Sequence, residues 1–118
     1  METHIQIACE EVPGKADARI VRFTGDLDAT NVDFITEQIF NYFSDGLVKI
    51  VADFKHLRYV NSTGLGVLLH FNKTAREKGG CFKIVNLNEN VYEIIEIIGA
   101  ASLLDIYDEL DEAIAALT

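Results

Sequence analysis

The feature that most restricts the possible folds of this chain is a buried-strand pattern at residues 47–52 with an amphipathic-helix pattern after it. Residues 47–52 are mostly apolar and include β-branched side chains, as expected for a strand covered on both faces. Further along, Leu65, Leu68 and Leu69 recur at the spacing of one face of a helix. A strand covered on both faces needs helices packed against its sheet, so these segments together predict an α/β fold.

The first third of the chain predicts a hairpin, a loop and a helix. Strand patterns at 5–7 and 19–24 flank a proline-glycine turn, which favours an antiparallel pair. A glycine ends the second strand, so residues 25–30 are expected to form a loop. Thr30 and Asp33 match a capping box and predict the start of the first helix.

Later segments alternate between strand and helix patterns, and glycines mark the helix ends. The predicted elements are strands over 47–52, 82–85 and 104–107, and helices that end at Gly46, Gly79-Gly80, Gly99 and near Leu117. This order predicts an α/β fold with a mixed β-sheet of four to five strands and about four helices packed mainly on one side. A chain of 118 residues is expected to form a single domain over residues 1–118.

Charge and composition argue against several classes of function. The chain has 19 acidic and 10 basic residues, so binding to nucleic acid, which needs clustered Lys and Arg, is not expected. Residues 1–11 include acids where a signal peptide is basic, and no apolar run is long enough to span a bilayer. We therefore expect a cytoplasmic protein with no membrane partner, in which Cys9 and Cys81 are reduced and packed.

Two adjacent hydroxyls, Ser62 and Thr63, stand where the strand pattern gives way to the helix. Unpaired backbone N–H groups and the helix dipole favour an anion at such a position, and Gly64 and Gly66 leave the backbone open. A hydroxyl here is suited to carry a phosphate. The alternative is that Ser62 or Thr63 only caps the helix, because both residue types are common N-caps.

Other site chemistry is not expected. His4, His56 and His70 are scattered without Cys or carboxylates at ligand spacing, so neither a metal site nor a cofactor is predicted. Ser62 lacks the Gly-x-Ser-x-Gly elbow and an evident His-Asp relay, which argues against a serine hydrolase. No catalytic residue is predicted, and the chain is not expected to be an enzyme.

The run Tyr59–Leu69, YVNSTGLGVLL, resembles the phosphorylation segment of STAS-domain anti-anti-sigma factors, also called anti-sigma factor antagonists. The usual form is a hydrophobic pair followed by Asp-Ser-Ser/Thr-Gly-Leu-Gly, so Asn61 stands where the family usually has Asp. Three further segments match in the family's order, and the resemblance spans roughly residues 4–117. These segments are Gly25–Ala29, Lys78–Gly80 and Ile98-Gly99.

The resemblance implies a phosphorylation switch. Ser62 is the implied phosphoacceptor, with Thr63 as the alternative, and the implied partner is an anti-sigma factor that is also a GHKL-type serine kinase. The unphosphorylated domain would bind this partner and release a sigma factor. Phosphorylation would end the binding, and a PP2C-type serine phosphatase would restore it. The implied partner-binding residues are Asp26, Asp28, Asn61, Thr63, Gly64, Gly66 and Val67.

Three questions stay open from the residues alone. Asn61 keeps the shape of Asp without its charge, so phosphorylation is slower if the family Asp aligns the hydroxyl and unchanged if it only caps the helix. Asp28 is alternatively a simple turn residue or an acid at the start of the helix. The domain as a whole is alternatively an accessory module that binds a nucleotide, a transporter or a signalling complex without phosphorylation, or a structural domain whose hydroxyl is never modified.

Helical periodicity assigns faces to the helix that follows Ser62. At about 100° per residue, Leu65, Leu68 and Ala75 centre on one face, which is expected to be core. Val67 falls at the edge of that face, beside His70, where it is expected to contact the partner. In the following helix, apolar residues also recur at helical spacing; these are Val91, Ile94, Ile95 and Ile98.

Overall fold

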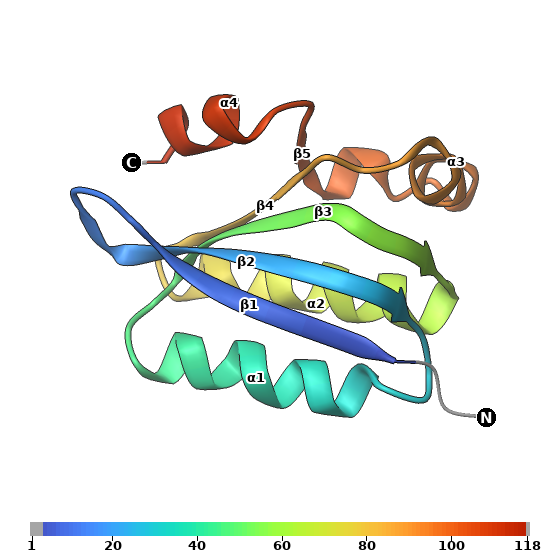
Figure 1. The fold of residues 1–118 in the computed structure, drawn as a ribbon, viewed down its shortest axis with the longest axis horizontal. Coiled ribbons are helices and arrows are strands. Elements are labelled where there is room, and N and C mark those ends of the chain that lie inside the picture. Colours follow the sequence, from blue (N-terminus) through green and yellow to red (C-terminus); the bar gives the residue numbers. More distant parts are fainter. Residues whose placement is uncertain (1–3, 118) are drawn as a thin grey trace.

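The computed structural model describes residues 4–117, which form one five-stranded sheet with the order β1-β2-β3-β4-β5 (Figure 1). β1 and β2 pair antiparallel, and each later pair is parallel. The elements are β1 (Ile5–Val12), β2 (Lys15–Leu27), α1 (Val32–Ser44), β3 (Lys49–Val60), α2 (Ser62–Glu77), β4 (Cys81–Val85), α3 (Glu89–Ile98), the 3₁₀ helix η1 (Ala101–Leu103), β5 (Asp105–Tyr107) and α4 (Leu110–Ala115). The predicted mixed α/β fold is confirmed; residues 1–3 and 118 of the predicted domain lie outside the described residues.

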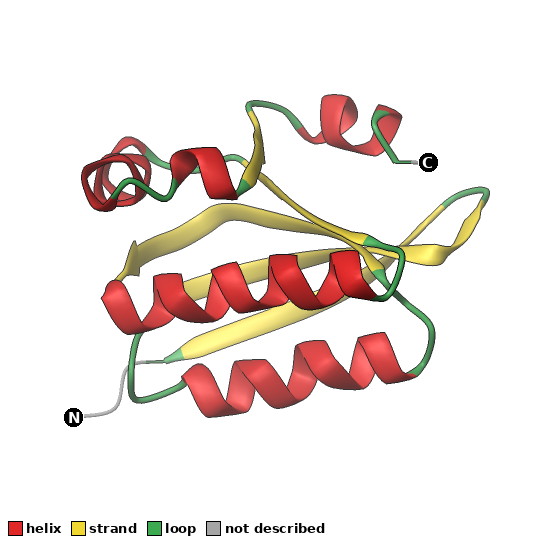
Figure 2. Cartoon of the chain, turned by 180° about the vertical axis from the view of Figure 1, so that it is seen from behind, coloured by secondary structure: helices red, strands yellow, loops and turns green. Residues whose placement is uncertain are grey.

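The helices divide unequally between the two faces of the sheet. α1 and α2 run along one face (Figures 1 and 2), where they share a core with alternate residues of the strands. The core includes the edge-to-face pair Phe23 and Phe54, whose ring centroids lie 5.0 Å apart, and α3 adds Val91 and Ile95. α4 packs on the opposite face over a smaller apolar cluster that includes Val51. Three of the four helices thus contribute to one core, as predicted.

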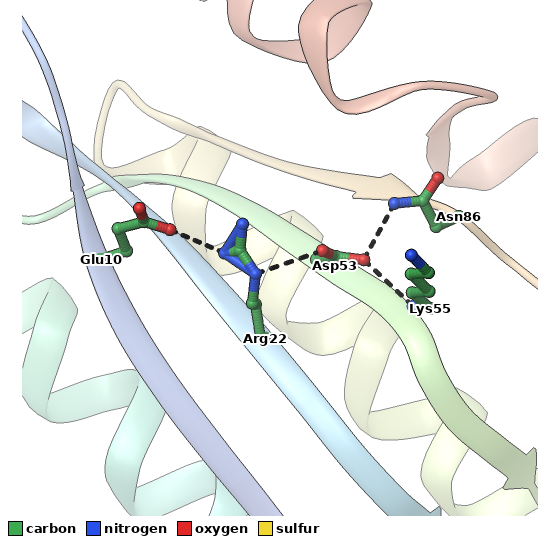
Figure 3. Close-up of polar contacts among 5 residues, drawn as sticks. All are labelled: Glu10, Arg22, Asp53, Lys55 and Asn86. Atoms are coloured by element: carbon green, nitrogen blue, oxygen red, sulfur yellow. Dashed lines mark hydrogen bonds and ion pairs between the residues drawn. The ribbon is translucent and has the colours of Figure 1, made fainter.

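Polar contacts cross the same face of the sheet as α4 (Figure 3). Arg22 of β2 donates to Glu10 of β1 at 2.7 Å, and its Nε lies 3.5 Å from Asp53 of β3. Asp53 is buried and also accepts from the Lys55 backbone N–H and the Asn86 side chain, each at 3.0 Å. Because these donors satisfy the buried carboxylate, the network holds β1, β2, β3 and the end of β4 together.

The sheet is longer than predicted at the end where the candidate site lies. The loop predicted over 25–30 is wrong in its first half, because β2 continues to Leu27. The strand predicted over 47–52 likewise continues to Val60. The two extensions pair with each other, and Leu27 lies opposite Val60. Glycine and aspartate have low strand propensity, so this pairing depends on the neighbouring strand and not on local preference.

The predicted capping box of Thr30 and Asp33 is also wrong. The N-cap of α1 is Asn31, and α1 begins at Val32. The Thr30 hydroxyl instead donates to Asp28 Oδ1 at 2.6 Å. Side-chain hydrogen bonds to near neighbours compete with helix capping, and here the preceding aspartate binds the hydroxyl.

The prediction of two packed thiols holds for only one cysteine. Both cysteines are free, but Cys9 is exposed, because it lies on the edge strand β1, and Cys81 is half-buried at the start of β4. Burial raises the pKa of the Cys81 thiol. Since the thiolate is the reactive form, burial makes Cys81 less reactive.

Candidate functional site

Ser62 and Thr63 are the first two residues of α2 and are both exposed. The N-cap is Asn61, whose side-chain oxygen accepts a hydrogen bond from the Gly64 backbone N–H at 2.9 Å. The alternative prediction, that Ser62 or Thr63 is merely the cap, is therefore wrong. With capping assigned to Asn61, two exposed hydroxyl residues lie at the positive end of the helix dipole, where an added anion is favoured.

The capping role of Asn61 can be tested by substitution. Asn61→Ala is expected to lower the free energy of unfolding by about 1 kcal/mol, because the Gly64 N–H loses its acceptor. Asn61→Asp is expected to match the wild type or exceed it by a few tenths of a kcal/mol, since a carboxylate also caps and complements the dipole. Denaturant unfolding at neutral pH compares the three proteins. An alanine variant as stable as the wild type would contradict the capping role.

Gly64 allows the first turn of α2 to pack against the end of β2. The residue is buried, and a Cβ atom at this position would lie 2.6 Å from the backbone oxygen of Leu27 and 3.1 Å from a methyl group of Val60. Gly66 is exposed, and a Cβ there would meet nothing within 4 Å. Of the two glycines predicted to contact a partner, only Gly66 lies on the surface. Gly64 is buried and lets α2 pack closely against Leu27 and Val60.

Asp26 lies at the end of β2, opposite Tyr59 of β3. Its carboxylate is 3.4 Å from Nε of Arg58, whose side chain is largely exposed. An exposed ion pair of this kind contributes little to stability, so its main effect is on the charge of the surface. Sequence reasoning did not identify Arg58, because its proximity to Asp26 depends on the pairing of β2 with β3.

Asn31 holds the loop between β2 and α1. It is buried, its side chain donates to the backbone oxygen of Asp26 at 2.8 Å, and it accepts from the Asp28 N–H at 3.1 Å. Asp28 Oδ1 in turn accepts from the Thr30 N–H at 2.9 Å. Asp28 therefore has the turn role that was its alternative interpretation, and it stays half-exposed beside α2. Asn31 was missed; the signal was an Asx residue just before the helical pattern.

The structure brings the two predicted segments together at one end of the sheet, where β2 and β3 finish. The Asn61 N–H donates to the backbone oxygen of Leu27 at 3.2 Å, so the start of α2 adjoins the loop after β2. Val67 is half-buried at the edge of the core face of α2, as predicted. The predicted residues that reach the surface here are called the candidate surface: Asp26, Asp28, Asn61, Ser62, Thr63, Gly66 and Val67. Tyr59, which was not predicted, is 47% exposed beside them.

Two other kinds of site find no support in the part of the chain that the structure describes. Residues 4–117 contain no group of three or more His, Cys, Asp and Glu side chains that could hold a metal ion. Over the same residues, none of the helices combines the length and apolar character needed to cross a membrane.

Comparison with known proteins identifies the family. The model of the STAS domain family matches residues 10–113. An anti-sigma F factor antagonist from Paenibacillus polymyxa is 30% identical over 99 residues, which cover 83% of this chain and 85% of that relative. The family match over residues 10–113 therefore includes both segments of the candidate surface, residues 26–28 and residues 61–67.

Solved structures share the fold. An anti-sigma factor antagonist from Mycobacterium paratuberculosis aligns with a TM-score of 0.83 at 21% identity, covering 97% of this chain and 94% of that one. The Bacillus cell fate determinant SpoIIAA in its phosphorylated form aligns with a TM-score of 0.69 at 21% identity, covering 93% and 97%. With the family match and the relative at 30% identity, these similarities show that the chain belongs to the STAS-domain family of anti-sigma factor antagonists.

Proposed function

We propose that this protein is a phosphorylation-controlled antagonist of an anti-sigma factor. Its unphosphorylated form binds an anti-sigma factor that is also a GHKL-type serine kinase, and a sigma factor is released. Phosphorylation of Ser62 ends the binding, and a PP2C-type phosphatase restores it. The observation that carries this proposal is the exposed Ser62 at the first position of α2, capped by Asn61 and adjacent to an acidic loop.

Electrostatics explains how one phosphate can control the contact. A phosphoserine adds between about one and a half and two negative charges at neutral pH. On the candidate surface, this charge joins the carboxylates of Asp26 and Asp28, and the nearby cation Arg58 is already paired with Asp26. A partner fitted to the neutral hydroxyl would then meet a desolvated anion without a counter-charge, which is strongly unfavourable.

Related proteins support the same mechanism. The Paenibacillus polymyxa relative is an antagonist of the anti-sigma F factor, and the fold neighbour SpoIIAA is known in a phosphorylated form. In the proposed role the chain is a phosphoacceptor and binding module, so it needs no catalytic residue and no cofactor of its own. Since sigma factors act in transcription, the proposal places the protein in the cytoplasm.

Mapping the phosphate tests the proposal. The chain is incubated with ATP and the GHKL-type kinase encoded nearest to its gene, and the product is located by fragmentation mass spectrometry. We expect one phosphate on Ser62 in the wild type and in Thr63→Ala, and none in Ser62→Ala. Phosphate on Thr63 alone would show that Thr63, and not Ser62, is the phosphoacceptor. No phosphate on either hydroxyl would instead favour an accessory or structural STAS module.

A further inference from the structure

The outer side of α3 and η1 exposes more apolar surface than the sheet and the other helices require. Ile97 is 76% exposed, Ile98 is 52% exposed and Leu103 is 58% exposed. Periodicity groups Ile98 with Val91 and Ile95, but the structure buries only the latter two, and Ile98 is exposed in the last position of α3. α3 and η1 are in contact, and exposed apolar side chains on neighbouring elements mark an interaction surface on a small protein.

Next to these residues, a groove separates η1 from the second half of α2. Leu69 and Leu103 contribute apolar lining, and the charged residues on the α2 side are Lys73, Arg76 and Glu77. The Asn72 side chain donates to the backbone oxygen of Leu103 at 2.9 Å and so fixes η1 against α2. The groove is therefore a fixed, partly apolar surface, and on its α2 side two basic residues outnumber one acidic residue.

The chain itself contains an element with the complementary chemistry. α3 carries Glu89, Glu93 and Glu96 and no Lys or Arg, and its exposed apolar residues lie at its C-terminal end. An acidic helix with exposed isoleucines complements a groove that has apolar lining and a net positive charge from Lys73 and Arg76 against Glu77. α3 contacts η1, and Leu103 of η1 lines the groove, so the two parts of the surface are connected through η1.

We propose that this surface is a homodimer interface, in which α3 of each copy packs against the α2–η1 groove of the other. A twofold axis forms the contact between acidic α3 and basic α2 twice, which is the usual arrangement of a self-complementary interface. Ile97, Ile98 and Leu103 are buried at its centre, and the charges lie around them. Figures 1 and 2 show α3 and η1 on the opposite side of the molecule from α1.

The proposed interface leaves Ser62 accessible. Ser62 is exposed at the start of α2, seven residues before Leu69, the first groove residue on this helix, which corresponds to about 10 Å along the helix. Ser62→Asp is therefore expected to dimerise like the wild type. The dimer thus goes beyond the proposed switch and stands or falls independently of it.

Charge reversal on either half of the surface tests the dimer. The positions are exposed, so the variants Glu93→Lys/Glu96→Lys and Lys73→Glu/Arg76→Glu should remain folded, which circular dichroism verifies. Sedimentation equilibrium should show a concentration-dependent dimer for the wild type. Each variant alone should dissociate at least about tenfold more readily, because like charges then face each other in both contacts.

Mixing the two variants gives the sharpest result. In a mixed dimer the reversed α3 of one chain faces the reversed α2 of the other, so association should return to the wild-type range. Glu37→Lys/Glu109→Lys makes the same change in net charge as Glu93→Lys/Glu96→Lys, at exposed positions elsewhere, and should dimerise normally. A wild type that stays monomeric, variants that dimerise as before, or a mixture that fails to associate would each overturn the proposal.

Discussion

Leu68→Asp is expected to unfold the domain, whereas Val67→Asp is expected to leave it folded and weaken partner binding. Leu68 is fully buried between α2 and the sheet, so an aspartate there places a charge in the core without a partner. The expected loss is more than about 4 kcal/mol, a large part of the total stability of a domain of this size. Val67 is half-buried, and an aspartate there can reach water at a smaller cost.

Thermal melts followed by circular dichroism and binding titrations with the anti-sigma partner separate the two variants. We expect Val67→Asp to melt cooperatively, below the wild type but well above Leu68→Asp, and to bind the partner less tightly. If both variants melt equally early, Val67 belongs to the core and the candidate surface does not extend onto α2. If Val67→Asp binds normally, this residue lies outside the partner contact.

Ser62→Asp is expected to lose most of its affinity for the partner, whereas Ser62→Ala retains it. Alanine removes one hydroxyl from an exposed residue and adds no charge. Aspartate places an anion without a counter-charge in the contact, which costs about 2–5 kcal/mol, or roughly a 30-fold to several-thousand-fold rise in the dissociation constant. Isothermal titration of each variant with the unmodified partner measures this ratio.

A matched control distinguishes the effect of a negative charge at Ser62 from the effect of one added negative charge anywhere on the protein. Ser44→Asp adds the same side chain at an exposed position at the far end of α1 and should bind like the wild type. Equal dissociation constants for Ser62→Ala and Ser62→Asp would show that charge at this position does not control binding. A loss of affinity in Ser44→Asp as large as in Ser62→Asp would show a general effect of net charge.

The type and order of the elements follow from the sequence alone, because these depend on local patterns. Apolar spacing identified the core face of α2, and Leu65, Leu68 and Ala75 are all buried. Glycines marked helix ends correctly, as at Gly99, where a left-handed backbone conformation ends α3. The exposed hydroxyls at the start of α2 were also identified from local pattern, since the end of a strand and the start of a helix meet there.

Only the tertiary structure decided how these elements meet. Residues 25–27, which were predicted to be loop, form strand because β2 pairs with β3 there. The same pairing places Arg58 beside Asp26. The choice of Asn61 as N-cap over Ser62 depends on where α2 begins against the end of β2. Strand register, side-chain caps and the exposure of Ile97 and Ile98 depend on contacts between residues distant in sequence, and local periodicity carries no information about those contacts.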